Sequence, residues 1–366
     1  MRLVSPKEDL AGALSVAARI ASAKSTIQIL SHVLIRAEEG RCEIAATDME
    51  LSLRVPLNAT VEEPGAVVLP RLAGDIVRSM ADGDVTVDHR TNEGVVGVSG
   101  SGSSFSLNCL QAGDFPELPL DDGEGLGVPT PVLVDAIDRV ARAASRDETR
   151  PVLTGVHVRL GPDGLTLVAT DSYRLAVAQA PLESAPSDAR EAIIPARALS
   201  EVSRLAGLAK VDEVEVVLTE TLALFRIGEY RLTSRIIEGQ FPDHRQLVPD
   251  TFEHDLAFDR GELLAVLGRI AVLAQRNTPV RLAFAEGQVT VSAVSDQVGE
   301  GHESLPVAFA GEPLEIGFNV EFLRAGVESV HGDEVRLGLI SPLRPGLLRG
   351  EGGGFRYLLM PIRLNA

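Results

Sequence analysis

The sequence carries the same landmarks three times, at a period of about 124 residues, and this repeat limits the possible folds more than any other feature. An acidic residue followed by glycine closes three predicted strand pairs, at Glu39-Gly40, Asp163-Gly164 and Glu286-Gly287. A small apolar residue, a hydroxyl residue and an aspartate follow each pair, at 46–48, 169–171 and 294–296. A repeat of this length excludes solenoid folds, which are built from much shorter repeats. The 366 residues therefore predict three copies of one domain, each large enough to bury a core.

Each copy combines helices with strands. Apolar residues recur at helical spacing in six segments, two in each copy: 5–21, 70–81, 130–146, 195–210, 259–276 and 318–331. Alternating stretches such as 214–217 and 289–292 predict half-buried strands between them. We expect an α+β fold in which two helices of each copy pack on an antiparallel sheet. Linker-like segments place the domain boundaries near residues 122 and 253, which divides the chain into 1–122, 123–253 and 254–366.

Several classes of protein are disfavoured. The chain has no apolar run of the roughly 20 residues that a membrane helix needs, and its first residues do not resemble a targeting signal, so we expect a cytoplasmic protein. Two cysteines, Cys42 and Cys109, are too few and too far apart for a disulfide framework or a zinc site. Motifs for nucleotide binding, for a serine nucleophile and for zinc hydrolysis are absent. No metal, cofactor or catalytic residue is predicted.

The repeated aspartates leave one alternative open. Asp48 and Asp171 could serve a metal-dependent hydrolase, but both stand at the same point of a structural repeat. Capping a turn is the commoner role of aspartate at such a point. We therefore regard an enzyme as the weaker hypothesis.

The distribution of charge allows two interpretations. A net charge of −18 normally argues against a polyanionic partner. The six predicted helices nevertheless hold 14 Lys and Arg against 10 Asp and Glu, whereas the remainder holds 20 against 42. Either the strands and loops simply are acidic, or the helices turn a cationic face toward a polyanion. The helix cations of the second interpretation are Arg19, Arg71, Arg78, Arg139, Arg142, Arg146, Arg197, Arg204, Lys210, Arg269 and Arg276.

Three segments together carry a family resemblance. They are Ala-Thr-Asp-Ser-Tyr-Arg-Leu-Ala-Val at 169–177, Phe-Pro-Asp-His-Arg at 241–245 and Tyr-Leu-Leu-Met-Pro-Ile-Arg-Leu at 357–364. With them the whole chain resembles the bacterial sliding clamps, the beta subunits of DNA polymerase III. The resemblance implies a head-to-tail homodimer whose six domains form a ring, with helices around the hole and strands outside. Such a ring encircles double-stranded DNA without reading bases, is loaded by an ATP-dependent loader and acts as a processivity factor.

The resemblance also implies a pocket between the second and third domains. In this family the pocket binds short linear motifs of the DNA polymerase III alpha subunit, the clamp loader, other polymerases and repair proteins. Without the resemblance, the same residues are better interpreted as core packing around a C-terminal strand. By the family's pattern the pocket residues here are Leu153, Thr170, Ser172, Tyr173, Arg174, Leu175, Pro242, Leu247, Leu358, Met360, Pro361, Ile362 and Arg363.

Contacts to DNA and between subunits are carried over in the same way. Lys24 and Arg150 match DNA-contact positions of the family, and the expected DNA-facing set adds Arg71, Arg78, Arg142, Arg146, Arg197, Arg204 and Arg276. The family's dimer-interface positions correspond to Phe105 and Leu107 in the first domain of one copy. In the third domain of the other copy they correspond to Arg269, Val272 and Leu273.

Some positions depart from the family pattern. Pro151 and Val152 stand beside Arg150, serines surround Phe105, and Gln246 occupies a position that is often basic. These departures, with only three lysines in the chain, raise a subsidiary hypothesis of a second, paralogous clamp that is insensitive to pocket-binding inhibitors. A scaffold with no DNA role, built from the same repeats, is the remaining alternative.

Overall fold

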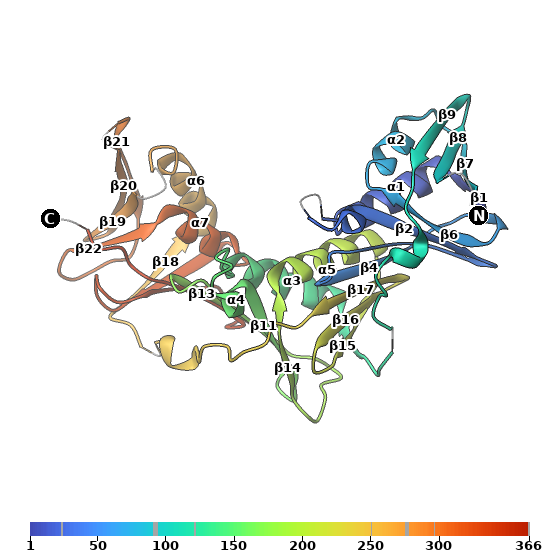
Figure 1. Ribbon diagram of the computed structural model, residues 1–366. Coiled ribbons are helices and arrows are strands. Elements are labelled where there is room, and N and C mark those ends of the chain that lie inside the picture. Colours follow the sequence, from blue (N-terminus) through green and yellow to red (C-terminus); the bar gives the residue numbers. More distant parts are fainter. Residues whose placement is uncertain are drawn as a thin grey trace. The chain divides into compact units, whose positions relative to one another are not determined.

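The computed structural model describes residues 1–22, 25–90, 94–120, 122–249, 251–274, 278–295 and 297–364. The α-helices of this part of the chain are α1 Lys7–Ala18, α2 Ala73–Ser79, α3 Thr130–Val140, α4 Pro151–Thr154, α5 Ala196–Ala209, α6 Arg260–Ile270 and α7 Val320–Glu328 (Figure 1). Short 3₁₀ turns lie at η1 Gln28–Ser31, η2 Ala112–Asp114, η3 Ala141–Ala143 and η4 Arg245–Leu247. All six predicted helices are confirmed, and α4 is an addition that the sequence pattern did not indicate.

Strands build four antiparallel sheets in the described residues. The first has the order β5-β1-β7-β8-β9 and contains β1 Arg2–Pro6, β5 Thr60–Glu63, β7 Asp84–Arg90, β8 Val95–Gly100 and β9 Ser103–Asn108. The last has the order β21-β20-β19-β22 and contains β19 Pro279–Ala285, β20 Gln288–Ser295, β21 Gly299–Pro306 and β22 Leu314–Asn319. These two smaller sheets belong to the first and third copies of the repeat.

The two larger sheets each have eight strands. One has the order β10-β15-β16-β17-β4-β3-β2-β6, with β2 His32–Glu38, β3 Arg41–Thr47, β4 Leu51–Pro56, β6 Gly65–Pro70, β10 Leu126–Pro129, β15 Glu213–Leu218, β16 Leu222–Ile227 and β17 Tyr230–Arg235. The other has the order β14-β11-β12-β13-β25-β24-β23-β18, with β11 Gly155–Gly161, β12 Gly164–Thr170, β13 Arg174–Ala180, β14 Arg190–Pro195, β18 His254–Asp259, β23 Glu334–Leu339, β24 Gly346–Arg349 and β25 Phe355–Leu359. Each sheet therefore joins strands of two neighbouring copies, at the pairs β4–β17 and β13–β25.

The repeated acidic-glycine pairs are the turns of three hairpins, as predicted. They connect β2 to β3, β11 to β12 and β19 to β20. The φ angles of Gly40, Gly164 and Gly287 are 76°, 98° and 75°, which is backbone that a residue with a Cβ adopts only at a cost. This requirement explains why the glycine recurs in all three copies.

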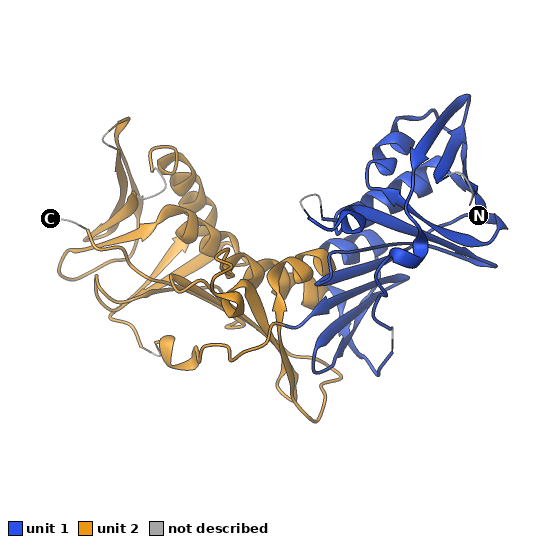
Figure 2. Ribbon diagram, in the orientation of Figure 1, with its two compact units in different colours: residues 1–130, 204–236 blue, residues 131–203, 237–366 orange. Residues whose placement is uncertain are grey.

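The chain divides into two compact units, coloured separately in Figure 2. Unit 1 comprises Met1–Thr130 and Arg204–Ile236, and unit 2 comprises Pro131–Ser203 and Ile237–Ala366. In unit 1, α1 packs against α2 and against β3 and β4. In unit 2, α6 contacts α7, and α3 buries Leu133, Ala136 and Ile137. None of the helices in the described ranges combines the length and the apolar character needed to cross a bilayer.

Candidate functional site

The turn between β12 and β13, residues 170–174, is at the centre of the predicted pocket. The Thr170 hydroxyl donates to the carbonyl oxygen of Arg174 over 2.6 Å. The Asp171 Oδ1 atom accepts the N–H groups of Tyr173 and Arg174 over 2.9 and 3.0 Å. Ser172 adopts a left-handed φ of 80°, which these bonds hold in place. Asp171 therefore caps a turn, which is the role that the repeat favoured over catalysis.

Asp48 performs the same task in the first copy. Its Oδ1 atom accepts the N–H groups of Glu50 and Leu51 over 3.0 and 2.8 Å. The third aspartate, Asp296, lies outside the described residues. In the two copies that can be compared, the recurring aspartate is thus a structural residue.

Arg174 is a positioning residue for the 170–174 turn. Its Nε donates to Asp171 Oδ2 over 2.9 Å, and Nη1 donates to the Tyr357 hydroxyl over 3.2 Å. The guanidinium also lies over the Phe322 ring, 4.2 Å from the centroid. Burial raises the pKa of Tyr357, which keeps the phenol protonated. Tyr357 and Phe322 were not among the predicted site residues, because they lie about 150 to 180 residues away in sequence.

An apolar cluster lies beneath this turn. Leu175 of β13 and Leu358 of β25 are cross-strand neighbours and are both buried. Val168, Val177 and Leu347 complete the buried cluster, and the partly buried Phe241, Val248 and Phe252 pack against it. Phe241, Val248 and Phe252 add to Pro242 and Leu247, the predicted pocket residues of the same segment.

Large apolar side chains are exposed around the same cluster. Tyr173, Leu247 and Met360 have 62%, 54% and 45% of their surface exposed. The Met360 N–H donates to the Tyr173 carbonyl oxygen over 2.9 Å, which fixes the C-terminal segment beside the turn. We call residues 170–175 and 358–361, with Phe241 and Leu247, the 170–174 surface. Exposed apolar side chains on a well-formed frame are typical of surfaces that bind other proteins.

The remaining predicted pocket residues lie on three segments. Leu153 is partly buried on α4, where its carbonyl oxygen accepts the Ser145 N–H over 2.8 Å. Pro242 is exposed directly after Phe241, whose ring stacks on His157 at 5.4 Å. Pro361 is partly buried after Met360. Ile362 instead pairs with Gly317 of β22, and Arg363 is exposed beyond it. The structure thus gathers Thr170, Ser172, Tyr173, Arg174, Leu175, Leu358 and Met360, whereas Ile362 and Arg363 follow the sheet of β22.

The predicted DNA-facing residues differ in their surroundings. Lys24 and Arg276 lie outside the described residues. Arg78 pairs with Asp75 at 2.9 Å, Arg142 with Glu328 at 3.2 Å, and Arg150 with Asp147 at 2.9 Å. Arg150 also donates to the Ser172 hydroxyl over 3.0 Å, which links it to the 170–174 turn. Arg71, Arg146 and Arg197 are exposed, and Arg204 is partly buried.

The observed helices are shorter than the predicted segments, and this changes their charge balance. Helices α1 to α7 as observed contain eight Lys and Arg and nine Asp and Glu, so the cationic excess predicted for the helices is wrong for the helical turns themselves. The predicted segments were longer than the helices and included cations just beyond their ends. α3 ends at Val140 and is followed by η3, so Arg142 lies in η3 and Arg146 in the loop beyond it. Arg71 likewise precedes α2.

The predicted dimer-seam residues lie at two sheet edges. Phe105 and Leu107 alternate on β9, an edge strand of the first sheet. Val272 and Leu273 follow α6 and are exposed and partly buried, respectively. Arg269 donates to both carboxylate oxygens of Glu303 on the edge strand β21, over 2.7 Å each. Leu273 lies over Gly301 of the same strand.

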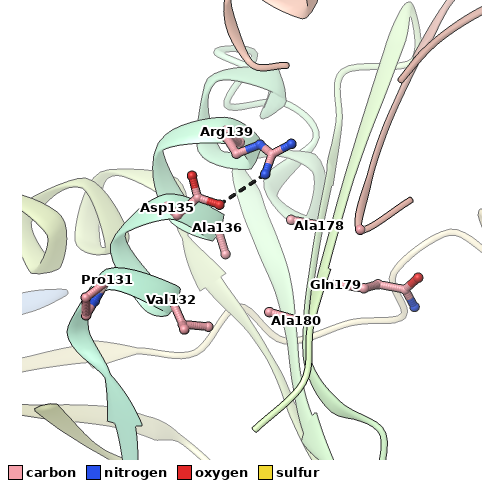
Figure 3. Close-up of a pocket in the computed structure, with 9 residues that line it drawn as sticks. Pro131, Val132, Asp135, Ala136, Arg139, Ala178, Gln179 and Ala180 are labelled. Carbon is pink, nitrogen blue, oxygen red and sulfur yellow. Dashed lines mark hydrogen bonds and ion pairs between the residues drawn. The ribbon is translucent and has the colours of Figure 1, made fainter. Parts of the chain in front are cut away.

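A cavity of about 320 Å³ in unit 2 is lined by none of the predicted pocket residues (Figure 3). Pro131, Val132 and Ala136 of α3 face Ala178 and Ala180 of β13 across it. The ion pair between Arg139 and Asp135, 3.0 Å long, lines the same cavity. Its lining is mostly apolar, and no group of histidine, cysteine, aspartate and glutamate residues that could hold a metal ion occurs in the described part of the chain.

Comparisons with known proteins were consistent along the whole chain. Residues 1–119, 127–243 and 245–363 match the N-terminal, central and C-terminal domains of the DNA polymerase III beta subunit. The chain is 34% identical to the beta sliding clamp of Synechococcus elongatus and 32% identical to that of Streptomyces coelicolor, with 100% of each chain covered.

Solved structures agree with these matches. A Caulobacter crescentus beta sliding clamp is 30% identical, with a TM-score of 0.93 over 100% of this chain and 99% of that chain. The DNA polymerase sliding clamp from Bacillus subtilis is 27% identical, with a TM-score of 0.92 and 100% of both chains covered. These matches confirm the predicted fold class, which is three copies of an α+β domain. The chain belongs to the DNA polymerase III beta subunit family, the beta sliding clamps, which are processivity factors and not enzymes.

Proposed function

We propose that two copies of this chain form a ring that encircles double-stranded DNA and holds a replicative polymerase on it. The full-length match to beta sliding clamps, such as that of Synechococcus elongatus at 34% identity with both chains covered completely, is the observation that carries the proposal. In this proposal each chain contributes three domains, 1–122, 123–253 and 254–366, and acts in the bacterial cytoplasm. Encirclement provides processivity because a closed ring need not bind DNA tightly in order to stay on it.

Two open sheet edges support a head-to-tail dimer. β9 has β8 as its neighbour on one side, and β21 has β20, so each presents unpaired backbone groups along its other side in the described chain. Exposed edges tend to pair with other strands. Phe105 and Leu107 beside β9 would pack against Val272 and Leu273 beside β21 of the second copy. The Arg269–Glu303 pair would then lie at the rim of that seam.

The arrangement of the arginines supports loose contact with DNA. Arg78, Arg142 and Arg150 lie in exposed ion pairs, which are worth about 0–1 kcal/mol each and can be exchanged for phosphate contacts. Arg71, Arg146, Arg197 and Arg204 are the further candidates, together with Lys24 and Arg276. Such contacts position a duplex without reading its sequence.

The 170–174 surface is the proposed binding site for partner peptides. Buried Leu175 and Leu358 provide an apolar floor, and Tyr173, Leu247 and Met360 stand exposed around it. Leucine or phenylalanine anchors of an extended peptide fit such a floor. The partners we propose are the DNA polymerase III alpha subunit, the clamp loader, and other polymerases and repair proteins, each through a short linear motif.

The ring is tested by sedimentation and by retention on DNA. We expect a dimer at micromolar concentration, and we expect the loaded protein to stay on a nicked circular plasmid and to leave after linearisation. A monomer that is also not retained on the nicked circle would refute the proposal. Growth after deletion of the gene separates a housekeeping clamp from a second, paralogous one.

A further inference from the structure

The first copy of the repeat rebuilds the frame of the 170–174 surface at residues 47–51. The Thr47 hydroxyl donates to the Leu51 carbonyl oxygen over 3.0 Å, as the Thr170 hydroxyl does to Arg174. Asp48 caps this turn through two N–H groups, as Asp171 does. Met49 has a φ of 78°, close to the 80° of Ser172. The two turns therefore share their backbone conformation.

The strand beside each turn is also equivalent. The Arg235 N–H donates to the Glu50 carbonyl oxygen over 2.8 Å, and the Met360 N–H donates to the Tyr173 carbonyl oxygen over 2.9 Å. This register puts Glu50 at the position of Tyr173 and Arg235 at the position of Met360. At these two positions the side chains are thus charged in the first copy and apolar or aromatic in the second.

The residues that form the floors of the two sites also differ in polarity, and the first copy again has the more polar ones. Ser52 and Thr233 are cross-strand neighbours in β4 and β17, at the place that Leu175 and Leu358 occupy in β13 and β25. The Ser52 hydroxyl is bonded to Thr47 Oγ1 over 2.9 Å, so an apolar anchor on this floor would cover bonded hydroxyl groups and remove their contact with water, whereas on the other floor it would meet leucine side chains. The floor therefore disfavours the leucine and phenylalanine anchors proposed for the other site.

A cavity of about 410 Å³ lies on this frame within unit 1. Four hydroxyl residues line it, Thr47, Ser52, Thr221 and Thr233, together with apolar parts of Met49, Pro116, Leu118, Pro119, Leu120 and Leu222. Met49 and Leu120 are 49% and 74% exposed. The cavity therefore combines a polar floor with apolar walls, and we call it the 47–51 cavity.

Charged groups at the 47–51 cavity determine the sign of the ligand. Two carboxylates, Glu50 and Glu117, and one guanidinium, Arg235, line it. The Arg235 Nε donates to the Met49 carbonyl oxygen over 3.0 Å, so this cation already serves the turn. Arg54 donates to the Pro119 carbonyl oxygen and is paired with Glu43 at 3.1 Å. The lining is therefore acidic on balance and complements a cation.

We propose that the 47–51 cavity is a second docking site, which binds an extended segment of a partner protein that carries a basic side chain next to an apolar one. The basic group would lie beside Glu117 and donate to the hydroxyl floor, and the apolar side chain would contact Met49 and Leu120. The expectation that the occupant is a peptide rests on the proposed function, because the frame is that of the proposed partner site. The two sites would then bind different segments, because their side chains differ although their backbone conformation is the same.

The test is fluorescence anisotropy with the full-length chain and a labelled hexapeptide that has one arginine followed by one leucine in a glycine-serine background. We expect saturable binding that weakens about ten-fold or more in Glu117→Lys, because the substitution replaces an attraction with a repulsion. Glu39→Lys, on the exposed turn between β2 and β3, is the matched control and should leave the affinity unchanged. Ser52→Leu combined with Thr233→Leu should also abolish binding of this probe.

Met360→Ala separates this inference from the proposed function. It should leave the arginine probe unaffected while it weakens peptides that carry polymerase motifs. A probe that binds equally well with glutamate in place of its arginine, that is indifferent to Glu117→Lys, or that does not bind at all, overturns the second site. Loss of polymerase peptides in Met360→Ala would still support the first site in each of these cases.

Discussion

The turns at 47–51 and 170–174 have the same backbone hydrogen bonds and different outward-facing side chains. Both use a threonine hydroxyl, an aspartate carboxylate and one left-handed residue to hold the chain. Glu50 and Arg235 in the first copy replace Tyr173 and Met360 in the second. A turn that is satisfied by its own polar groups does not depend on the residues around it, so those residues were able to diverge.

The capping aspartate of the second copy also belongs to a buried side-chain network. Asp48 caps its turn through N–H groups of the backbone. Asp171 additionally holds Arg174, and the two side chains are only 11% and 13% exposed. The second copy has thus turned a cap into part of a buried network with Tyr357 and Phe322. Removing the same residue type should therefore have unequal effects at the two positions.

The largest effect that we predict is on stability. Asp171→Ala should lower the free energy of unfolding by about 3 kcal/mol, because it leaves the largely buried guanidinium of Arg174 without its carboxylate. Asp48→Ala should cost about 1 kcal/mol, the usual value for losing a capping bond at a turn. Urea unfolding followed by circular dichroism measures both. Equal losses in the two variants would show that the Arg174 network adds nothing to the cap.

The next effect concerns binding. Met360→Ala should weaken peptides that carry polymerase motifs by about 2 kcal/mol, or roughly thirty-fold, because one apolar contact is removed from the bound state. Met49→Ala is the matched control, since Met49 is similarly exposed and belongs to the equivalent turn. Isothermal titration with a polymerase tail peptide provides the affinities. If both methionine variants bind that peptide as the wild type does, the 170–174 surface is not its site.

Local patterns in the sequence predicted most of the fold. The acidic-glycine turns, the six helices and the capping aspartates could be predicted because their causes lie within a few residues, as the left-handed φ of Gly40 and Gly164 shows. The family motif at 169–177 also located the turn that the structure places beside Met360.

Features that depend on distant residues could not be predicted. The burial of Arg174 depends on Tyr357 and Phe322, and the floor of the 47–51 cavity depends on the pairing of β4 with β17, a strand from the next copy. Periodicity also overestimated helix lengths, because apolar spacing continues through η3 after α3 has ended at Val140. The predicted cationic excess of the helices is lost at these ends, since Arg142 and Arg146 lie beyond the last turn of α3.

The smallest predicted effect is a dependence of stability on pH that the second copy has at this position and the first copy does not. Phe241, which covers the apolar cluster, stacks on the partly buried His157, and burial lowers the pKa of His157 and of His244. The equivalent Phe115 of the first copy packs on Leu34 and Val68 instead. A histidine whose pKa is lower in the folded state favours folding while it is neutral. Its contribution is complete above the unfolded pKa of about 6.5 and is lost as the pH falls through the folded value.

His157→Gln removes one of these two groups without changing Phe241. Between pH 7.5 and pH 5.5 the wild type should lose more unfolding free energy than the variant, and the difference should be smaller than the effect of Asp48→Ala. Glu191, 3.5 Å from His157 Nε2, opposes the shift and keeps it modest, because a carboxylate stabilises the imidazolium. Urea titrations of both proteins at the two pH values measure the difference. A variant that loses as much stability as the wild type would assign the pH dependence to groups other than His157.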